Sequence, residues 1–246
     1  PLPPVSADEL REILSRAARY SVHSYTESLK HGFITLTGGH RLGVCGTAAV
    51  ENGQVIGGRG LSSLNVRIAR QIRALEAEVA SWISTGRPQS VLLVSPPGYG
   101  KTTLLREWVR QVSGQGRTVA VADERGEIAA LSGGVPQFDI GGCTDVLEGC
   151  PKKQAALMLL KTMSPELIAF DEITAPEDVE AVSLCAHCGT AVLASAHAAD
   201  VDDLCRRPLY RALLALQVFD CAVVIEKQDG QRVYRKKGLE DIACSN

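Results

Sequence analysis

The sequence lacks an excess of charge of either sign. Its 26 Lys and Arg residues oppose 28 Asp and Glu residues, which gives a formal net charge of −2. These charges are spread along the chain, so no basic face for nucleic acid or anionic lipid is indicated. Direct nucleic-acid binding is therefore disfavoured, and we expect no nucleic-acid partner.

Long hydrophobic runs are also missing. No stretch reaches the roughly 20 apolar residues that a membrane-spanning helix needs. The first residues, PLPPVSADEL, have neither the basic start nor the apolar run of a signal peptide. We expect a soluble, cytoplasmic protein that does not insert into a membrane and reaches one only through partners.

The eight cysteines lack the tight spacing of a disulfide framework. We therefore expect reduced thiols and no disulfide. Residues 185–188, CAHC, have a spacing that suits two zinc ligands, but no second paired cluster accompanies them. A helix that packs both thiols against a sheet explains these residues as well, and zinc is the weaker interpretation.

The N-terminal part, residues 1–70, is predicted to be a small α+β domain. Ser6 and Glu9 have the spacing of a capping box, and apolar residues at helical spacing follow. Between residues 31 and 56, short β-rich segments alternate with Gly-Gly and Asn-Gly turns, as in hairpins. Residues 57–62, GGRGLS, are expected to interrupt this pattern. We place the domain boundary near residue 70.

The second domain, residues 71–246, has a different pattern. After a helix expected at about 71–83, short apolar runs with little alternation are separated by segments typical of helices. These runs are VLLV (91–94), TVAVAD (118–123), LIAFDE (167–172) and AVLASAH (191–197). Strands buried on both faces have this pattern, which predicts an α/β fold with a mostly parallel sheet flanked by helices. The tail predicts a hairpin that turns at Asp229 and Gly230.

The corner between the first of these strands and the following helix carries the motif SPPGYGKTT, residues 95–103. Free N–H groups and the positive dipole at a helix N-terminus bind phosphate, and glycines let the main chain approach it closely. Lys101 would reach the outer phosphates, and Thr102 would be a Mg²⁺ ligand. The motif is a Walker A loop with one departure, Ser95 in place of the usual glycine. The predicted ATP-binding residues are Pro97, Gly98, Tyr99, Gly100, Lys101, Thr102 and Thr103.

Carboxylates follow a second buried strand, at the end where open parallel sheets bind ligands. Asp171 and Glu172 end the run LIAFDE and have the form of a Walker B pair. Asp171 would hold Mg²⁺, and Glu172 would polarise the attacking water. A solvated acidic turn after a core strand is the alternative interpretation of this pair.

Two further groups are candidates at neighbouring strand ends. In DERGE, residues 123–127, Asp123 and Glu124 are preferred for orienting water or supporting the metal, although a salt bridge within a loop has the same sequence. His197, at the end of AVLASAH, would sense the γ-phosphate and relay its presence, or would be a structural histidine.

The motifs SPPGYGKTTLLR, VADERGEI, GVPQ, TDVLEGCPK, MSPELIAFDEI and SAH, in that order, resemble the stage III sporulation protein AA family of endospore-forming bacteria. That family is related to the ATPases of type II and type IV secretion and of pilus retraction. The resemblance covers about residues 38–226. It implies a RecA-like P-loop ATPase domain behind the smaller N-terminal domain, with ATP and Mg²⁺ as cofactors. It also implies a homohexameric ring at the cytoplasmic face of a membrane channel between mother cell and forespore, with the channel proteins as partners.

The resemblance also implies residue roles. Lys101 and Thr102 match the family's nucleotide-binding loop and Asp171 and Glu172 its Walker B pair. The acidic box corresponds to Asp123, Glu124 and Glu127, and the histidine box to His197. In such ATPases arginines of the N-terminal domain reach the phosphates, and the candidates here are Arg41, Arg59 and Arg67, with Arg41 assigned a catalytic role. Each of the three could instead form a surface ion pair.

Two positions depart from the family pattern. Cys143 stands where the family usually has an arginine, and Thr174 where it commonly has a glycine. If the missing arginine stabilises the phosphates, turnover would be weak, while ATP binding would survive. The leading hypothesis is a Mg²⁺-dependent ATPase that energises assembly of, or transport through, a membrane channel complex during sporulation. The alternatives are a nucleotide-gated structural ring with little hydrolysis and a RecA-like nucleic-acid motor.

Overall fold

The computed structural model describes residues 4–18, 32–51, 54–71, 77–83 and 86–238 of the chain. Its contacts divide the chain into two compact units. One unit contains Pro1–Gln71 and Ala130–Phe138, and the other contains Ile72–Ala129 and Asp139–Asn246. The first unit thus includes a short segment from the middle of the sequence, which no sequence pattern indicated. The domain boundary near residue 70 stays a prediction.

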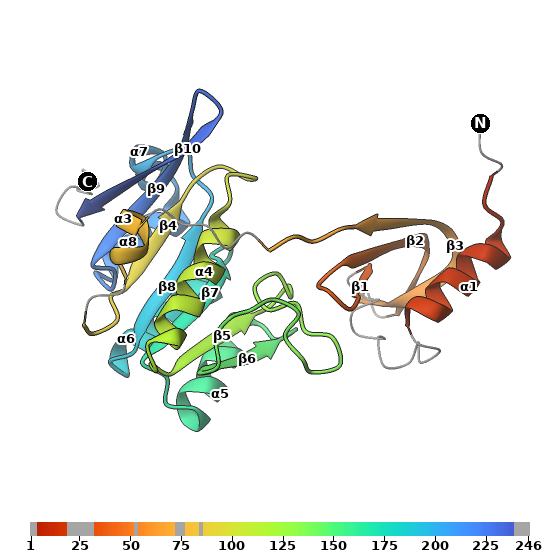
Figure 1. The fold of residues 1–246 in the computed structure, drawn as a ribbon, viewed down its shortest axis with the longest axis horizontal. Coiled ribbons are helices and arrows are strands. Elements are labelled where there is room, and N and C mark those ends of the chain that lie inside the picture. Colours follow the sequence, from red (N-terminus) through yellow and green to blue (C-terminus); the bar gives the residue numbers. More distant parts are fainter. Residues whose placement is uncertain (1–3, 19–31, 52–53, 72–76, 84–85, 239–246) are drawn as a thin grey trace. The chain divides into compact units, whose positions relative to one another are not determined.

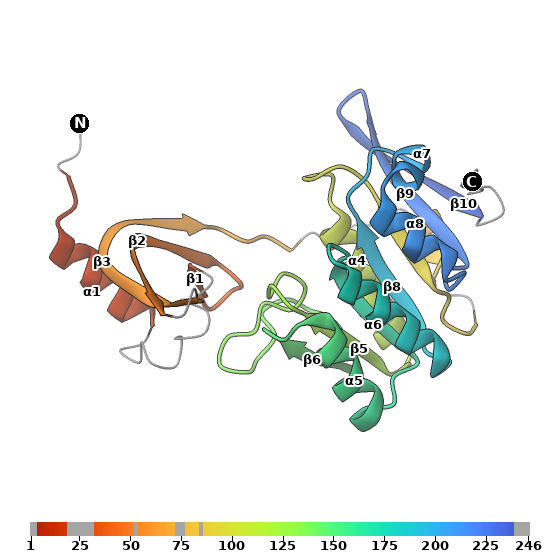
Figure 2. The ribbon, with the colours of Figure 1, turned by 180° about the vertical axis from the view of Figure 1, so that it is seen from behind.

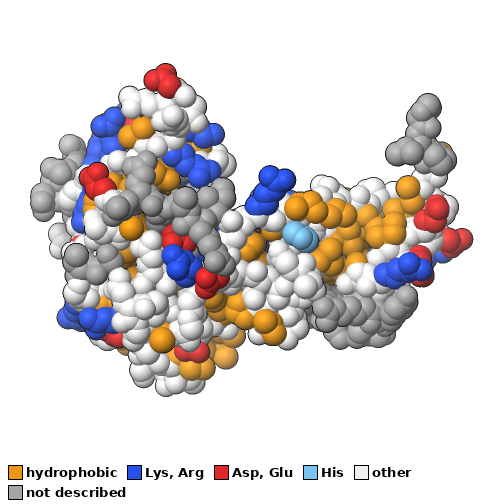
Figure 3. Space-filling model, in the orientation of Figure 1, with side chains coloured by type: hydrophobic (Ala, Val, Ile, Leu, Met, Phe, Trp, Pro, Cys, Tyr) orange, Lys and Arg blue, Asp and Glu red, His pale blue; other side chains and the backbone are white. Residues whose placement is uncertain are grey.

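In its described residues, the first unit consists of a helix and a small antiparallel sheet of strand order β1-β2-β3 (Figure 1). Its elements are α1 (Ala7–Ala17), β1 (Phe33–Thr35), β2 (Arg41–Glu51) and β3 (Gln54–Arg67). The predicted capping box is confirmed, because Ser6 Oγ accepts the Glu9 N–H at 3.2 Å and the Glu9 carboxylate accepts the Ser6 N–H at 2.7 Å. Ala18, Ile34 and Leu42 form the small core. Figure 3 shows many hydrophobic side chains on one face of this unit.

The predicted interruption at residues 57–62 is wrong, since β3 continues through this segment. Two glycines explain the difference. A Cβ atom on Gly46 would lie 2.1 Å from the carbonyl oxygen of Gly60, and Gly60 has a positive φ of 61°. The pairing of β2 and β3 shifts register at this point. The glycines therefore form an irregularity within the hairpin, where the two backbones approach closely, rather than ending the strand.

The second unit is built on a sheet of seven strands in the order β10-β9-β4-β8-β7-β5-β6. All neighbours are parallel except β9 and β10. The strands are β4 (Val91–Val94), β5 (Val119–Asp123), β6 (Thr144–Glu148), β7 (Leu167–Glu172), β8 (Ala191–Ala196), β9 (Cys221–Gln228) and β10 (Gln231–Gly238). The four apolar runs form β4, β5, β7 and β8, and the tail forms the predicted hairpin. The edge strand β6 was not predicted, because it is only partly buried.

Helices cover both faces of this sheet, which confirms the predicted α/β fold. They are α3 (Ala77–Ser81), α4 (Lys101–Gly114), α5 (Lys152–Thr162), α6 (Pro176–His187), α7 (Val201–Arg206) and α8 (Pro208–Ala215). Figure 1 shows α4 in front of the sheet, and Figure 2 shows α5, α6 and α8 on the opposite face. The first part of the helix expected at 71–83 falls on residues 72–76, outside the described residues. The large core lies between the sheet and these helices and includes Leu92, Ile168 and Phe170.

The parallel strands place their carboxyl ends at one edge of the sheet. This edge collects the loops after β4, β5, β7 and β8, which are the loops that carry the predicted site residues. Since β9 runs parallel to its neighbour β4, the turn between β9 and β10 also emerges at this edge. The topology therefore brings segments far apart in sequence to one place.

The cysteines do not all follow the expectation of free thiols. Six described cysteines are free, but Cys205 is disulfide-bonded, so the expectation of no disulfide is wrong. Spacing along a sequence does not show which thiols a fold brings within bonding distance. Cys185 lies in the core, and burial raises the pKa of its thiol to about 12, whereas Cys188 is exposed. Among the described residues, no helix has both the length and the apolar character that a membrane crossing requires.

Candidate functional site

The loop between β4 and α4 has the geometry of a phosphate-binding loop. Gly98 and Gly100 have positive φ values of 77° and 98°, which other residues rarely adopt. Gly100 is the N-cap of α4, and no side chain caps the N–H groups of the first helical turn from this position. The positive end of the helix dipole is therefore available to an anion.

Lys101 turns its ammonium group back onto this loop. The side chain is 5% exposed, and Nζ donates to Ser95 O at 2.6 Å and to Pro96 O at 3.1 Å. Burial lowers the pKa of Lys101 to about 8, although Glu172 and Asp171 oppose the shift. Ser95 fits where glycine is usual, because its φ is not positive and its carbonyl and hydroxyl oxygens both face the ammonium group. The acceptors of Lys101 are thus uncharged.

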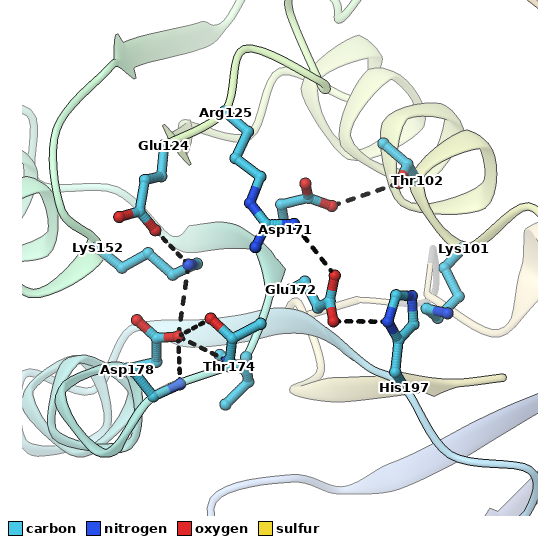
Figure 4. A network of polar contacts seen from close by, with 12 residues as sticks. Lys101, Thr102, Glu124, Arg125, Lys152, Asp171, Glu172, Thr174, Asp178 and His197 are labelled. Carbon is cyan, nitrogen blue, oxygen red and sulfur yellow. Dashed lines mark hydrogen bonds and ion pairs between the residues drawn. The ribbon is translucent and has the colours of Figure 1, made fainter. Parts of the chain in front are cut away.

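Thr102 and Asp171 come together from different elements. Thr102, on α4, places Oγ1 3.4 Å from Oδ1 of Asp171 near the end of β7 (Figure 4). Asp171 is 4% exposed. Burial, and then the negative charges of Glu127, Asp123 and Glu172, raise its pKa to about 7. A hydroxyl and a carboxylate whose negative charge is poorly compensated are suitable ligands for Mg²⁺.

A magnesium ion at this position would take its other ligands from phosphate and water. In the described part of the chain, no three His, Cys, Asp or Glu side chains gather as a metal site. Mg²⁺ commonly binds through one or two protein oxygens together with substrate phosphates. The residues present therefore fit a nucleotide-bound magnesium ion and not a preformed all-protein site.

Glu172 and His197 form a close pair at the ends of β7 and β8. His197 Nδ1 lies 2.6 Å from Glu172 Oε1, and an Arg125 guanidinium nitrogen lies 3.5 Å from Glu172 Oε2. Figure 4 shows the Glu172 carboxylate between these two partners. Burial and the neighbouring Lys101 charge lower the pKa of His197. The Glu172 carboxylate opposes this shift, and the 2.6 Å separation places His197 Nδ1 to donate a hydrogen bond to it.

Glu124 is partly exposed and pairs with a separate cluster of two buried charges, Lys152 and Asp178. Lys152, the first residue of α5, is 2% exposed and places Nζ 2.5 Å from Glu124 and 3.4 Å from Asp178. Asp178 in turn accepts the N–H groups of Thr174 and Ala175, so that it caps the start of α6. The cluster ties the loops after β5 and β7 to the starts of two helices. Thr174 contributes to this cap without a positive φ, so its backbone does not require the glycine expected there.

Asp123 is committed to its own loop. Its carboxylate accepts three backbone N–H groups, from Glu127 at 2.8 Å, Ile128 at 3.0 Å and Ala129 at 2.8 Å. Arg106 on α4 holds the same loop from the other side, because it donates to the carbonyl groups of Glu127 and Ile128. The loop that carries Glu124 and Arg125 is thereby fixed beside the P-loop helix.

The chain matches the sequence model of "Sporulation stage III, protein AA" over residues 4–240. It is also 36% identical over 243 residues to Stage III sporulation protein AA of Bacillus subtilis (strain 168), which covers 95% of this chain and 79% of that protein. The chain belongs to this family. A match of 30% identity to protein SEEDLING PLASTID DEVELOPMENT 1 of Arabidopsis thaliana covers 65% of this chain and 23% of that protein.

Solved structures share the fold of this family member. The Legionella pneumophila ATPase DotB has a TM-score of 0.60 at 16% identity, covering 96% of this chain and 69% of that chain. The pilus retraction motor PilT with bound ADP has a TM-score of 0.53 at 16% identity, covering 80% and 58%. The chain therefore shares the fold of the ATPase DotB and of the pilus retraction motor PilT.

The structure brings most of the predicted site residues of this family member to one edge. The P-loop residues 95–103 lie there with Asp171, Glu172, Glu124 and His197. The arginine candidates belong to the other unit. Arg41 and Arg67 are register partners on β2 and β3, with the Arg41 guanidinium 4.4 Å above the Phe33 ring, and Arg59 lies on β3. Their roles at the phosphates stay predictions.

Cys143 lies far from Lys101 within the chain. Its N–H donates to Ser113 Oγ at 2.8 Å, and Ser113 belongs to the last turn of α4, whereas Lys101 begins that helix. A separation of twelve residues along a helix corresponds to about 18 Å. Cys143 therefore does not contact the loop before α4 in its own chain.

Several residues of the site were not found from the sequence. These are Arg106, Arg125, Lys152, Asp178 and Tyr210, whose hydroxyl joins the backbone of His197 to that of Ile173. For two of them the sequence shows a helix-start pattern. Lys152 follows a proline at a helix start, and Asp178 is the third residue of a helix that begins with Pro176. A charged side chain in a first helical turn is common, so the pattern alone does not identify a buried partner.

Proposed function

We propose that this protein is a Mg²⁺-dependent ATPase of the secretion-ATPase type. The observation that carries the proposal is the meeting of three groups at one sheet edge. Lys101 is a buried ammonium without a charged acceptor, and Thr102 and Asp171 offer two oxygen ligands 3.4 Å apart. The amino end of α4 lies in the same loop. A nucleoside triphosphate with Mg²⁺ supplies the missing negative charge and the missing cation together.

The residues of the site have distinct roles in this proposal. Bound MgATP supplies the reactive γ-phosphoryl group. Lys101 and the first N–H groups of α4 hold the phosphates, and Thr102 and Asp171 hold the metal. Glu172 accepts a proton from the attacking water and orients it, while His197 holds the Glu172 carboxylate in position. Glu124 supports the water or the metal from the loop after β5, although its bond to Lys152 fixes its orientation.

We further propose the cellular setting that the family membership supports. The protein would act as a homohexameric ring during sporulation, in contact with membrane channel proteins at the boundary of mother cell and forespore. Hydrolysis would energise assembly of this complex or transport through it. Arg41 of the N-terminal unit would reach the phosphates during the cycle.

Steady-state release of phosphate from ATP tests the activity. Wild-type protein is expected to turn over only with Mg²⁺, and Glu172→Gln to bind MgATP without turnover. Single-stranded DNA is expected to have no effect, whereas stimulation would favour a nucleic-acid motor. Light scattering after size exclusion, with and without MgATP, tests the ring. Absence of MgATP binding by the folded wild-type protein would contradict the proposal.

A nucleotide-gated ring with little hydrolysis is the second candidate. The contacts of Glu172 favour it, because both carboxylate oxygens already have partners, His197 at 2.6 Å and Arg125 at 3.5 Å. A proton acceptor held in this way must change partners before it activates water. Tight MgATP binding by the wild type, with turnover no faster than that of Glu172→Gln, would select this candidate.

A further inference from the structure

The β9–β10 hairpin emerges next to the P-loop. Strand β9 is the parallel neighbour of β4, with Val224 opposite Val94, and the P-loop begins directly after Val94. The last residues of β9 and the first residues of β10 therefore extend beside this loop. Figure 3 shows Lys and Arg side chains on the surface in this region.

Two cations of the hairpin contact P-loop residues. Lys227 places Nζ 4.6 Å above the ring of Tyr99. The Arg232 guanidinium covers Gly100, since a Cβ atom on this glycine would lie 2.9 Å from Arg232 Cζ. The φ of 98° at Gly100 favours glycine, and the absence of a side chain lets the guanidinium lie directly against the backbone there. This contact places a cation at the amino end of α4.

This arrangement is electrostatically unfavourable without an anion. Lys227 and Arg232 are direct partners across the hairpin, and like charges opposite each other destabilise a strand pair. Both also lie next to a helix end that carries a positive partial charge. Neither makes a hydrogen bond or an ion pair with any residue that the structure describes. By contrast, Arg235 on the same strand pairs with Glu226 at 3.0 Å.

We infer that Arg232 and Lys227 bind the polyphosphate of the nucleotide, so that the C-terminal hairpin completes the site from within the same chain. The inference rests on the proposed ATPase function. A guanidinium group offers planar, paired donors that match phosphate oxygens. In this inference Arg232 contacts the phosphate oxygens directly. Lys227 adds a second positive charge and packs on the ring of Tyr99, which belongs to the loop. Phosphate binding then relieves the repulsion between the two cations.

Titration calorimetry with MgATP tests this inference on the full chain. Arg232→Gln is compared with wild type and with Arg235→Gln, which removes the same charge from the same strand but breaks an ion pair with Glu226. A hydrogen bond to a charged group corresponds to roughly a tenfold or greater change in affinity. We expect Arg232→Gln to raise the Kd for MgATP about tenfold, Arg232→Lys to raise it less, and Arg235→Gln to leave it within about twofold.

Thermal unfolding separates binding from a structural role. We expect Arg232→Gln to keep or raise the Tm of the nucleotide-free protein, because it removes a like-charge pair, and to reduce the increase in Tm on addition of MgATP. A lowered Tm without nucleotide together with an unchanged MgATP shift would assign Arg232 to folding and overturn the inference.

The remaining outcomes are equally decisive. If wild type and Arg232→Gln bind MgATP alike, or if both arginine variants lose affinity equally, the inference fails while the proposed function stands. If folded wild-type protein does not bind MgATP, the proposed function fails and the inference fails with it.

Discussion

Two lysines are buried at the same edge of the seven-stranded sheet, and they have different partners. Lys101 is 5% exposed and donates only to uncharged oxygens of its own loop. Lys152 is 2% exposed and lies between the carboxylates of Glu124 and Asp178. Both begin helices, so local structure does not distinguish them. The difference lies in the charge of their acceptors.

This difference separates a binding residue from a structural one. A buried ammonium group needs a compensating negative charge. Lys152 has this compensation within the folded chain, so its ion cluster is complete without a ligand. Lys101 does not, and its lowered pKa of about 8 reflects this. A bound anion would supply the negative charge that Lys101 lacks within the chain. This need for a compensating charge is the physical basis of the proposed nucleotide site.

The largest expected effect concerns Lys101. We expect Lys101→Met to lower turnover about 10²–10³-fold, the usual cost of losing one preorganised donor. The free energy of unfolding should fall by less than about 1 kcal/mol or rise, because the substitution removes a poorly compensated buried charge. Phosphate release and urea unfolding measure the two effects. Lys161→Met, at an exposed lysine on α5, is the control. Unchanged turnover of Lys101→Met would contradict the distinction between the two buried lysines.

Lys152 should behave in the opposite way. We expect Lys152→Met to lower the free energy of unfolding by about 3 kcal/mol, because Asp178 is left buried without its cation. The adjacent Lys153 pairs with Glu180 at the surface, and Lys153→Met should cost less than about 1 kcal/mol. Urea unfolding compares the neighbouring variants. Equal losses would show that the Lys152 cluster contributes no more than a surface ion pair.

The carboxylate beside Lys101 should make stability depend on pH. The pKa of Asp171 rises from 3.8 to about 7 on folding, so the folded protein binds the extra proton between these values, and the stability associated with it is lost as pH rises. Asp171→Asn does not titrate. Without Mg²⁺ or nucleotide, its stability relative to wild type should increase by about 1 kcal/mol from about pH 5.5 to 6.5.

Denaturant unfolding at several pH values measures this trend. Asp145→Asn, at an exposed position on β6, is the matched control and should show no such trend. If the difference in unfolding free energy between Asp171→Asn and wild type does not change with pH, the Asp171 charge is already compensated, as that of Asp178 is by Lys152. The contrast between the Lys101 and Lys152 surroundings would then be weaker.

The smallest effect is expected at Cys143. Its position at the far end of α4 from Lys101 predicts that Cys143→Arg, which introduces the arginine expected from the family resemblance, changes the Kd for MgATP by less than about twofold. Calorimetry on the single-chain species tests this. A gain of tenfold or more would show that this position acts on the phosphates after all, and that the edge described here is incomplete.

The sequence allowed most of the second unit to be predicted, because local patterns carried the information. Continuous apolar runs indicated β4 and β7, and turn chemistry indicated the hairpin at Asp229 and Gly230. The N-terminal sheet was less predictable. Glycines at residues 57–62 suggested a break, but opposite Gly46 they allow two backbones to approach and the strand to continue. A glycine in a sequence indicates only that the backbone has conformational freedom. Whether it ends a strand or allows two strands to approach closely depends on the residue opposite it in the sheet.

The candidate Walker A and B motifs could be found from the sequence because each is a short continuous segment next to the end of an apolar strand. The sequence by itself thus determined the family and the α/β class, and it indicated the loop after β4 as the candidate phosphate site. It did not determine which charges meet. Lys152 is 28 residues from Glu124, and Arg232 is more than a hundred residues from Gly100. Only the order of strands in the sheet brings these groups together, since ion pairing depends on distance in space, and that distance is set by tertiary packing.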